Sequence, residues 1–199
     1  MYDTKAQTIE NFSHKDFPEI MSKKDIESLS LDGIIELSNG NIVLLGEQFK
    51  IQIYYQERLG NSYQYYLNNI IYTSISNDGT IEDYKLIRKK QNSGTYDSRI
   101  SVKSLYLSYY AFEKNGSLYL LYNDNAANVD MNKESVKPFY PRKVKSSIVK
   151  LVKIDGEDIS SQVLINGKID KQILRSFLFV NDNNIIVSSL GKELYFSKI

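Results

Sequence analysis

Short runs of β-branched, aliphatic and aromatic residues alternate with polar positions along most of the chain, and glycine-containing dipeptides separate several of these runs. Four such dipeptides lie between two β-prone segments: Asn39-Gly40, Asp78-Gly79, Asn115-Gly116 and Asp155-Gly156. Asn-Gly and Asp-Gly tolerate the positive φ angles that tight hairpin turns require. Asn183-Asn184 is a weaker fifth signal. The pattern therefore predicts a succession of antiparallel β-hairpins.

These hairpins recur with a regular spacing. Gly40 and Gly116 are 76 positions apart, and Gly79 and Gly156 are 77 positions apart, so a unit of two hairpins repeats. Each unit holds four strands. We expect a first β repeat unit over residues 33–90, a second over 104–166 and a partial third over 174–199, within one structural domain. The lead segment 1–32 is expected to hold a short helix from Ser22 to Leu29 or an incomplete blade.

Tandem four-stranded antiparallel units are typical of β-propeller blades. Two and a half blades would leave exposed sheet edges, because a propeller needs at least four blades to close. We therefore expect an all-β, partial β-propeller-like fold that forms the C-terminal part of a larger ring. Two alternatives remain open: a half-ring completed by a second copy, and a β-sandwich, which needs no closure.

The composition excludes several common catalytic and metal-binding sets. The 199 residues include 25 Lys+Arg, 24 Asp+Glu, one histidine and no cysteine. Disulfides, thiolate zinc sites and multi-histidine sites are therefore excluded. The single histidine, His14, is expected to be an ordinary surface residue. No apolar stretch is long enough to span a bilayer, so we expect no membrane insertion.

Two basic segments are candidates for nucleic-acid contact. One runs from Lys137 to Lys153 with Phe139 and Tyr140 interleaved, and the other covers residues 85–90. Aromatic and cationic side chains together suit single-stranded nucleic acid. Successive strand residues point to opposite faces, however, and lysines commonly protect edge strands from sheet-to-sheet pairing. We therefore interpret these lysines as solvated edge-strand charges and expect no nucleic-acid partner.

Tyrosines gather in the expected connection over residues 56–69. Tyr63, Tyr65 and Tyr66 lie within it, and Tyr54 comes just before it. Tyrosine offers a large contact area with a hydrogen-bonding tip at small entropic cost, which suits recognition loops. The rings could equally fill gaps between blades. This Tyr-rich loop is the best candidate binding site in the sequence.

Glu47 and Gln48 follow the apolar run NIVLLG. A carboxylate beside an amide can accept from and donate to paired hydroxyl groups of a ligand such as a sugar. The alternative is a buried polar pair satisfied by neighbouring backbone groups. We include both residues among the candidate binding residues.

Oxygen-bearing side chains cluster at Asp124, Asn125, Asn128 and Asp130. Calcium takes six to eight oxygen ligands, which such a cluster could help to supply. The spacing lacks the pattern of an EF-hand loop, and an Asx-rich turn explains the same residues. We expect no cofactor, with calcium as the one option.

Two motifs carry a resemblance to a known group of proteins. SNGNIVLLGEQ places an apolar run ending in Glu-Gln after a turn glycine, and SLYLLYNDN ends an apolar run in Asn-Asp-Asn. In these motifs residues 32–199 resemble a family of uncharacterised, envelope-associated, propeller-like bacterial proteins. The resemblance implies a propeller-type fold and a periplasmic, cell-surface or secreted location, and it implies no known activity. Residues 1–32 stand where that family would carry earlier blades.

No catalytic set emerges from these motifs. The sequence favours a non-enzymatic recognition or scaffold module that binds a protein or a glycan through its Tyr-rich loops. One alternative is a glycan-acting hydrolase whose propeller funnel brings together Glu47, Asp124 and Asp182. Another is a structural unit that self-associates through exposed blade edges.

Overall fold

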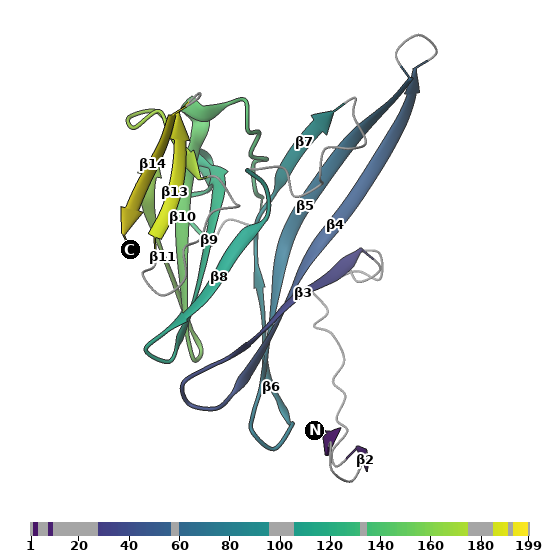
Figure 1. Ribbon diagram of the computed structural model, residues 1–199, viewed down its shortest axis with the longest axis vertical. Helices are drawn as coiled ribbons and strands as arrows, with labels where there is room; N and C mark the ends of the chain where they lie inside the picture. The colour runs from purple at the N-terminus through teal and green to yellow at the C-terminus, as the bar shows by residue number, and fades with distance from the viewer. Residues whose placement is uncertain are drawn as a thin grey trace.

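The fold is built almost entirely from antiparallel strands (Figure 1). The computed structural model describes residues 2–3, 8–9, 28–56, 60–95, 106–131, 135–174, 185–190 and 193–198. The prediction of an all-β fold with antiparallel sheets is confirmed. His14, Asp182 and Asn183-Asn184 lie outside the described residues, as does most of the helix expected from Ser22. Leu29, the last residue of that expected helix, begins a strand instead.

The first large sheet has the order β3-β4-β5-β6. Its strands are β3 (Leu29–Glu36), β4 (Ile42–Gln56), β5 (Gly60–Ile75) and β6 (Ile81–Ile87). A further strand, β7 (Gln91–Thr95), pairs with the first half of β5, while β6 pairs with its second half. β4 and β5 are therefore much longer than their neighbours and extend past them.

The second large sheet has the order β11-β10-β9-β8. Its strands are β8 (Tyr109–Lys114), β9 (Ser117–Asn125), β10 (Ser147–Asp155) and β11 (Asp158–Asn166). The 3-10 turns η1 (Ala126–Asn128) and η2 (Val144–Ser146) lie in the long connection between β9 and β10. A smaller sheet follows, made of β12 (Ile173–Leu174), β13 (Ile185–Leu190) and β14 (Glu193–Lys198). Two short strands, β1 (Tyr2–Asp3) and β2 (Thr8–Ile9), pair with each other.

All four strong hairpin signals correspond to hairpins, so these predictions are confirmed. Asn115 and Gly116 both have positive φ angles, 54° and 80°, and form the two-residue loop of the third hairpin. In the fourth hairpin Asp155 pairs with Asp158. The loop is therefore Gly156-Glu157, one position later than the predicted dipeptide, because glycine is favoured at the first loop position.

The two large sheets pack face to face around a shared apolar core. β4 contributes Val43 and Leu45, and β9 contributes Leu118, Leu120 and Tyr122, all at most 1% exposed. The remaining buried members of this core are Leu37, Ile70, Tyr72, Ile87, Val152 and Ile154. Alternate residues of a strand face opposite sides of its sheet, so one face of each strand supplies this core.

The opposite face of the second sheet is also covered. Leu121, Val149 and Leu151 pack there with Leu174 of β12. β9 is consequently buried on both faces, and the three sheets follow one another in chain order (Figure 1). Face-to-face packing of open antiparallel sheets is common to a β-sandwich and to adjoining propeller blades.

The connection expected over residues 56–69 is not a loop, and that prediction is wrong. Most of it belongs to β5, in which Tyr63 pairs with Ile53 and Tyr65 pairs with Ile51. Tyrosine favours the pleated surface of a sheet, and here its partners across the strand pair are β-branched. The polar residues between the tyrosines occupy the other face of the same strand.

Candidate functional site

The ends of β4 and β5 form a projection that we call the hairpin arm, made of residues 49–56 and 60–67. β3 accompanies β4 only as far as Gln48, which pairs with Leu29. Beyond that point β5 is the one strand among the described residues that pairs with β4, and the two strands extend away from the packed sheets (Figure 1). The arm is the part of the described chain that projects furthest beyond the shared core.

One face of the arm is apolar. Directly paired residues share a face, so Ile51 and Ile53 lie beside Tyr65 and Tyr63. The rings of these two tyrosines are stacked, with centroids 6.5 Å apart. Tyr65 is 4% exposed, whereas Ile51 is 41%, Ile53 59% and Tyr55 75% exposed. Exposure therefore rises along β4 towards the tip, and the outer half of this face is uncovered.

The base of the apolar face is covered by the long connections. Tyr65 and Leu67 pack with Leu107, Phe139 and Ile173 in a third apolar cluster. Phe139 is held there by backbone hydrogen bonds to residues 90 and 92. The arm is thus anchored to the body at one end by packing, which gives its free part a defined direction.

The opposite face of the arm is polar. It carries Lys50, Gln52 and Tyr54 on β4, with Gln64 and Tyr66 beside them on β5. The Tyr66 hydroxyl donates to Gln52 Oε1 at 3.3 Å. The structure therefore separates the four candidate tyrosines into two pairs, since Tyr63 and Tyr65 lie on the apolar face and the other two do not.

The outer edge of the arm carries backbone groups that no described strand pairs with. The Phe49 N–H donates to Ser28 O at 2.8 Å, so the backbone groups of Phe49 point away from β5. Backbone groups alternate in direction along a strand, so those of Ile51, Ile53 and Tyr55 also point outward. In the described residues no strand pairs with β4 on this side beyond Gln48.

A second notable feature is a buried ionic cluster between the two large sheets. Glu47 of β4 forms an ion pair with Lys89, which is 1% exposed. The Ser108 hydroxyl donates to the other Glu47 oxygen at 2.9 Å. Lys89 Nζ also donates to Gln91 Oε1 at 3.1 Å and to Leu67 O at 3.4 Å. Both charges are therefore compensated within the protein.

Asp124 and Lys150 form the other half of this cluster. Lys150 Nζ lies 3.9 Å from Asp124 Oδ2 and donates to Asn128 O at 2.7 Å. The Asn128 amide donates to Asp124 Oδ1 at 2.6 Å. Burial raises the pKa of Asp124 to about 6, although Asn128, Lys150 and Lys89 act in the opposite direction. Burial also lowers the pKa of Lys150 and of Lys89.

The candidate calcium ligands come together in part, but as a hydrogen-bonded turn. Asn125 Oδ1 accepts from the Ala127 N–H at 3.0 Å, and Asn128 Oδ1 accepts from the Lys137 N–H at 2.8 Å. Asp130 is exposed. The ammonium group of Lys150 lies beside Asp124 and supplies the positive charge that a bound cation would supply. Over the described ranges no group of three or more His, Cys, Asp or Glu could hold a metal ion.

The interpretation of Lys89 and Lys150 as solvated edge-strand charges is wrong, because they are 1% and 2% exposed. Lys150 lies on β10, an inner strand, and shares a face with Val152 and Ile154. Because Lys150 occurs at every second position with these apolar residues, the sequence pattern already indicated that it lies on their buried face. The other basic residues of the same segment are exposed but lie in the connection before β10 and not on an edge strand: Lys137, Arg142, Lys143 and Lys145.

Sequence reasoning missed Gln91, and it placed Asn123 in the Asn-Asp-Asn motif without recognising its role. The Gln91 amide donates to Asn123 O and Ser108 O and accepts from the Ser108 N–H at 2.6 Å. The Asn123 side chain exchanges two hydrogen bonds with the backbone of Leu174, which attaches β12 to β9. Both side-chain amides form hydrogen bonds to backbone groups that belong to other parts of the chain. Nothing in the sequence next to either residue indicates these distant partners.

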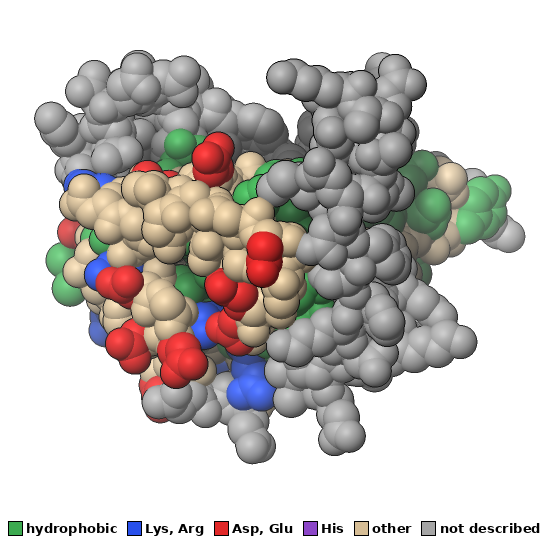
Figure 2. All heavy atoms as spheres, turned by 90° about the horizontal axis from the view of Figure 1, so that it is seen from below, with side chains coloured by type: hydrophobic (Ala, Val, Ile, Leu, Met, Phe, Trp, Pro, Cys, Tyr) green, Lys and Arg blue, Asp and Glu red, His purple; other side chains and the backbone are tan. Residues whose placement is uncertain are grey.

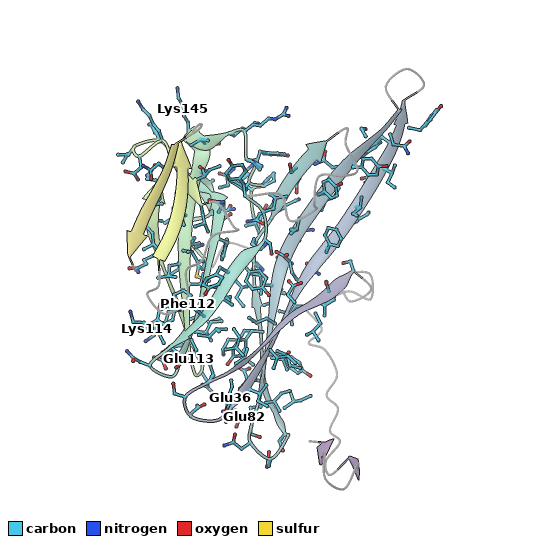
Figure 3. All side chains as sticks on the ribbon, in the orientation of Figure 1. Glu36, Glu82, Phe112, Glu113, Lys114 and Lys145 are labelled. Atoms are coloured by element: carbon cyan, nitrogen blue, oxygen red, sulfur yellow. The ribbon has the colours of Figure 1, made fainter. Side chains whose placement is uncertain are left out.

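The two ends of the stacked sheets differ in charge. Figure 3 places Glu36, Glu82 and Glu113, with Lys114, at the end formed by the hairpin turns, and Lys145 at the opposite end. Seen from below, acidic side chains gather over the turn end (Figure 2). The Lys85 ammonium donates to Glu157 O at 3.3 Å, which links the two sheets there. Both ends are strongly hydrated surfaces, in contrast to the apolar face of the arm.

Comparisons with known proteins found no counterpart: no family model matches the chain, and no curated protein or solved structure gives a significant match. Among the described residues, no helix has the length and apolar character needed to cross a membrane.

Proposed function

We propose that this protein is a non-enzymatic recognition module that binds another polypeptide through the hairpin arm. The observation that carries the proposal is the combination, on one short segment of β4, of an exposed apolar face and an unpaired backbone edge. An added strand would use both features, since its backbone would pair with the edge and its side chains would cover the face.

The arrangement also specifies the chemistry of the partner. Ile51, Ile53 and Tyr55 project at every second position of β4 from the same face. A partner strand would therefore need apolar side chains at alternate positions, with polar side chains permitted between them. The aliphatic pair favours a polypeptide over a glycan, because sugars are recognised mainly by polar groups and flat aromatic rings.

Glu47 and Asp124, the described carboxylates considered for glycan hydrolysis, lie in positions that favour a non-enzymatic module. Glu47 is 3% exposed and Asp124 is 0% exposed, and each faces a buried lysine. A hydrolase needs both carboxyl groups at its substrate, whereas these groups connect the two sheets. We assign the ionic cluster a structural role. The resemblance in the Glu-Gln and Asn-Asp-Asn motifs supports placing the module in a bacterial envelope.

The test is a selection of displayed random peptides on the purified chain, followed by fluorescence anisotropy with the enriched peptides. We expect enrichment of extended sequences with apolar residues at alternate positions. Ile53→Glu should weaken their binding at least tenfold, because it places a charge in the centre of the apolar face.

The matched control is Gln52→Glu, which adds the same charge one residue away on the polar face and should leave peptide binding within about twofold. Circular dichroism should show that both variants keep the fold, since both positions lie outside the shared core. Enriched peptides that bind Ile53→Glu as tightly as the original chain would refute the proposal, as would a selection that enriches nothing on a chain that is monomeric at the concentration used.

A further inference from the structure

We infer that the strand received by the arm is β4 of a second copy of this chain, paired antiparallel about a two-fold axis at Ile53. This inference rests on the proposed function, because it identifies the partner of the same surface. The register, the side-chain pattern and the charge of the free edge all support this pairing.

The register follows from the direction of the backbone groups. The free edge covers residues 50–56, and its central residue is Ile53. With the two-fold axis there, Ile53 lies opposite the partner's Ile53, and Ile51 lies opposite the partner's Tyr55. All these residues direct N–H and C=O outward, so each opposed pair can exchange two hydrogen bonds. The arrangement therefore uses every outward backbone group from Ile51 to Tyr55.

The side-chain pattern is self-complementary in this register. Ile51, Ile53 and Tyr55 of both copies fall on the same face and form one continuous apolar stripe, next to Tyr63 and Tyr65 of each arm. Isoleucine opposite isoleucine and isoleucine opposite tyrosine are favourable cross-strand pairs. The pairing would cover the most exposed apolar side chains of the arm, which are 59% and 75% exposed at positions 53 and 55.

Charge does not oppose the pairing. Lys50 is the only charged residue from position 49 to 56, and in this register it lies opposite the partner's Gln56. Edge strands are usually protected from pairing by a charged residue on the face that would be covered. The apolar face of this edge has none. Each copy contributes the same edge, so the interface is closed by two-fold symmetry and yields a dimer.

The first experiment is sedimentation velocity on the full chain over a dilution series, with Ile53→Lys as the test variant. We expect the original chain to form a dimer that dissociates on dilution. Ile53→Lys should raise the dimer dissociation constant at least a hundredfold, because two lysines would then lie directly opposite each other. Gln64→Lys adds the same charge to the polar face of β5 and should change the constant less than threefold.

The second experiment tests the register. The chain has no cysteine, so single cysteines can be introduced and treated with a short bismaleimide. Ile53→Cys should crosslink to itself. Ile51→Cys should crosslink poorly to itself and well to Tyr55→Cys when the two variants are mixed. An equimolar mixture of Ile53→Lys and Ile53→Glu should restore the dimer, since the opposed charges would then attract.

The outcomes separate the two proposals. A chain that stays monomeric at all concentrations but binds selected peptides at the arm overturns this inference and leaves the proposed function standing. A monomer that binds no peptide overturns both. A dimer that persists in Ile53→Lys and gives no crosslink at position 53 places the interface elsewhere and also overturns the inference.

Discussion

The two halves of β4 both contain aliphatic residues but lie in different environments. Its first half, residues 42–48, lies between β3 and β5 and faces the second sheet, and Val43 and Leu45 there are at most 1% exposed. Its second half pairs with β5 alone, and Ile53 is 59% exposed. The first half contains a continuous aliphatic run from Ile42 to Leu45, whereas the second half carries Ile51 and Ile53 at alternate positions. The comparison shows that the neighbouring sheets, and not the apolar residues alone, decide whether an apolar face of the strand is covered.

An irregularity in both strands marks the boundary between these halves. The pairing shifts between Glu47 and Phe49 on β4, opposite Leu67 and Ile70 on β5. At this point Glu47 turns towards Lys89 and begins the ionic cluster. The cluster thus lies where the apolar core shared by the two sheets ends and the separate cluster at the base of the arm begins.

The largest expected effect comes from removing one charge at this boundary. Lys89→Met should lower the free energy of unfolding by about 3 to 5 kcal/mol, because it leaves the Glu47 carboxylate buried without its ion pair. Urea denaturation measures the loss. Lys153→Met is the matched control, since Lys153 pairs with Asp155 at the surface and its loss should have much the smaller effect. Equal losses in the two variants would contradict the structural role of the cluster.

Truncation of an aliphatic side chain in each half of β4 tests the comparison directly. Leu45→Ala should cost about 3 kcal/mol, because it leaves a cavity in the shared core. Ile53→Ala should cost less than about 1 kcal/mol, because the side chain is mostly exposed. Thermal or urea unfolding at a concentration where the chain is monomeric gives both values. A loss above about 2 kcal/mol for Ile53→Ala would mean that the arm is part of the core.

A pH dependence is expected from Asp124. Its pKa is about 6 in the folded chain and near 4 when unfolded, so the folded state binds the proton more tightly. The free energy of unfolding should therefore rise as the pH falls from 7 to 4, by roughly 2 to 3 kcal/mol from this group. Urea titrations at several pH values measure the slope.

Asp124→Asn provides the control for this pH dependence, because it keeps a polar side chain of the same size without the titration. The variant should lose the slope between pH 4 and 7. Asp78, Glu113 and Asp155 have lowered pKa values, so they stabilise the fold above their ordinary pKa values and this opposite contribution is lost only as the pH falls below about 5. An unchanged slope in the variant would exclude Asp124 as its source.

The smallest effect is expected on the polar face of the arm. Tyr66→Phe removes the hydrogen bond to Gln52 and should cost less than about 1 kcal/mol, because the bond is long and water can replace it. Peptide binding and dimer formation should both stay within about twofold of the original chain. A tenfold loss of either would move the interaction surface to the polar face.

Local features were determined by the sequence itself. The hairpins at Asn39-Gly40, Asp78-Gly79 and Asn115-Gly116 depend on the φ preferences of two residues, and the strand alternation depends on side chains two positions apart. Such features were predictable because every residue that causes them is a close neighbour in the chain.

Only the tertiary structure decided which apolar and charged residues are covered. Lys89 meets Glu47 across 42 positions of sequence, and Gln91 reaches Asn123 across 32. The burial of these groups depends on which sheet lies opposite, and that is set by the packing of distant segments rather than by their own pattern. For the same reason the Tyr-rich segment became a strand of an exposed arm, since β4 was available to pair with it and β3 ended before the tip.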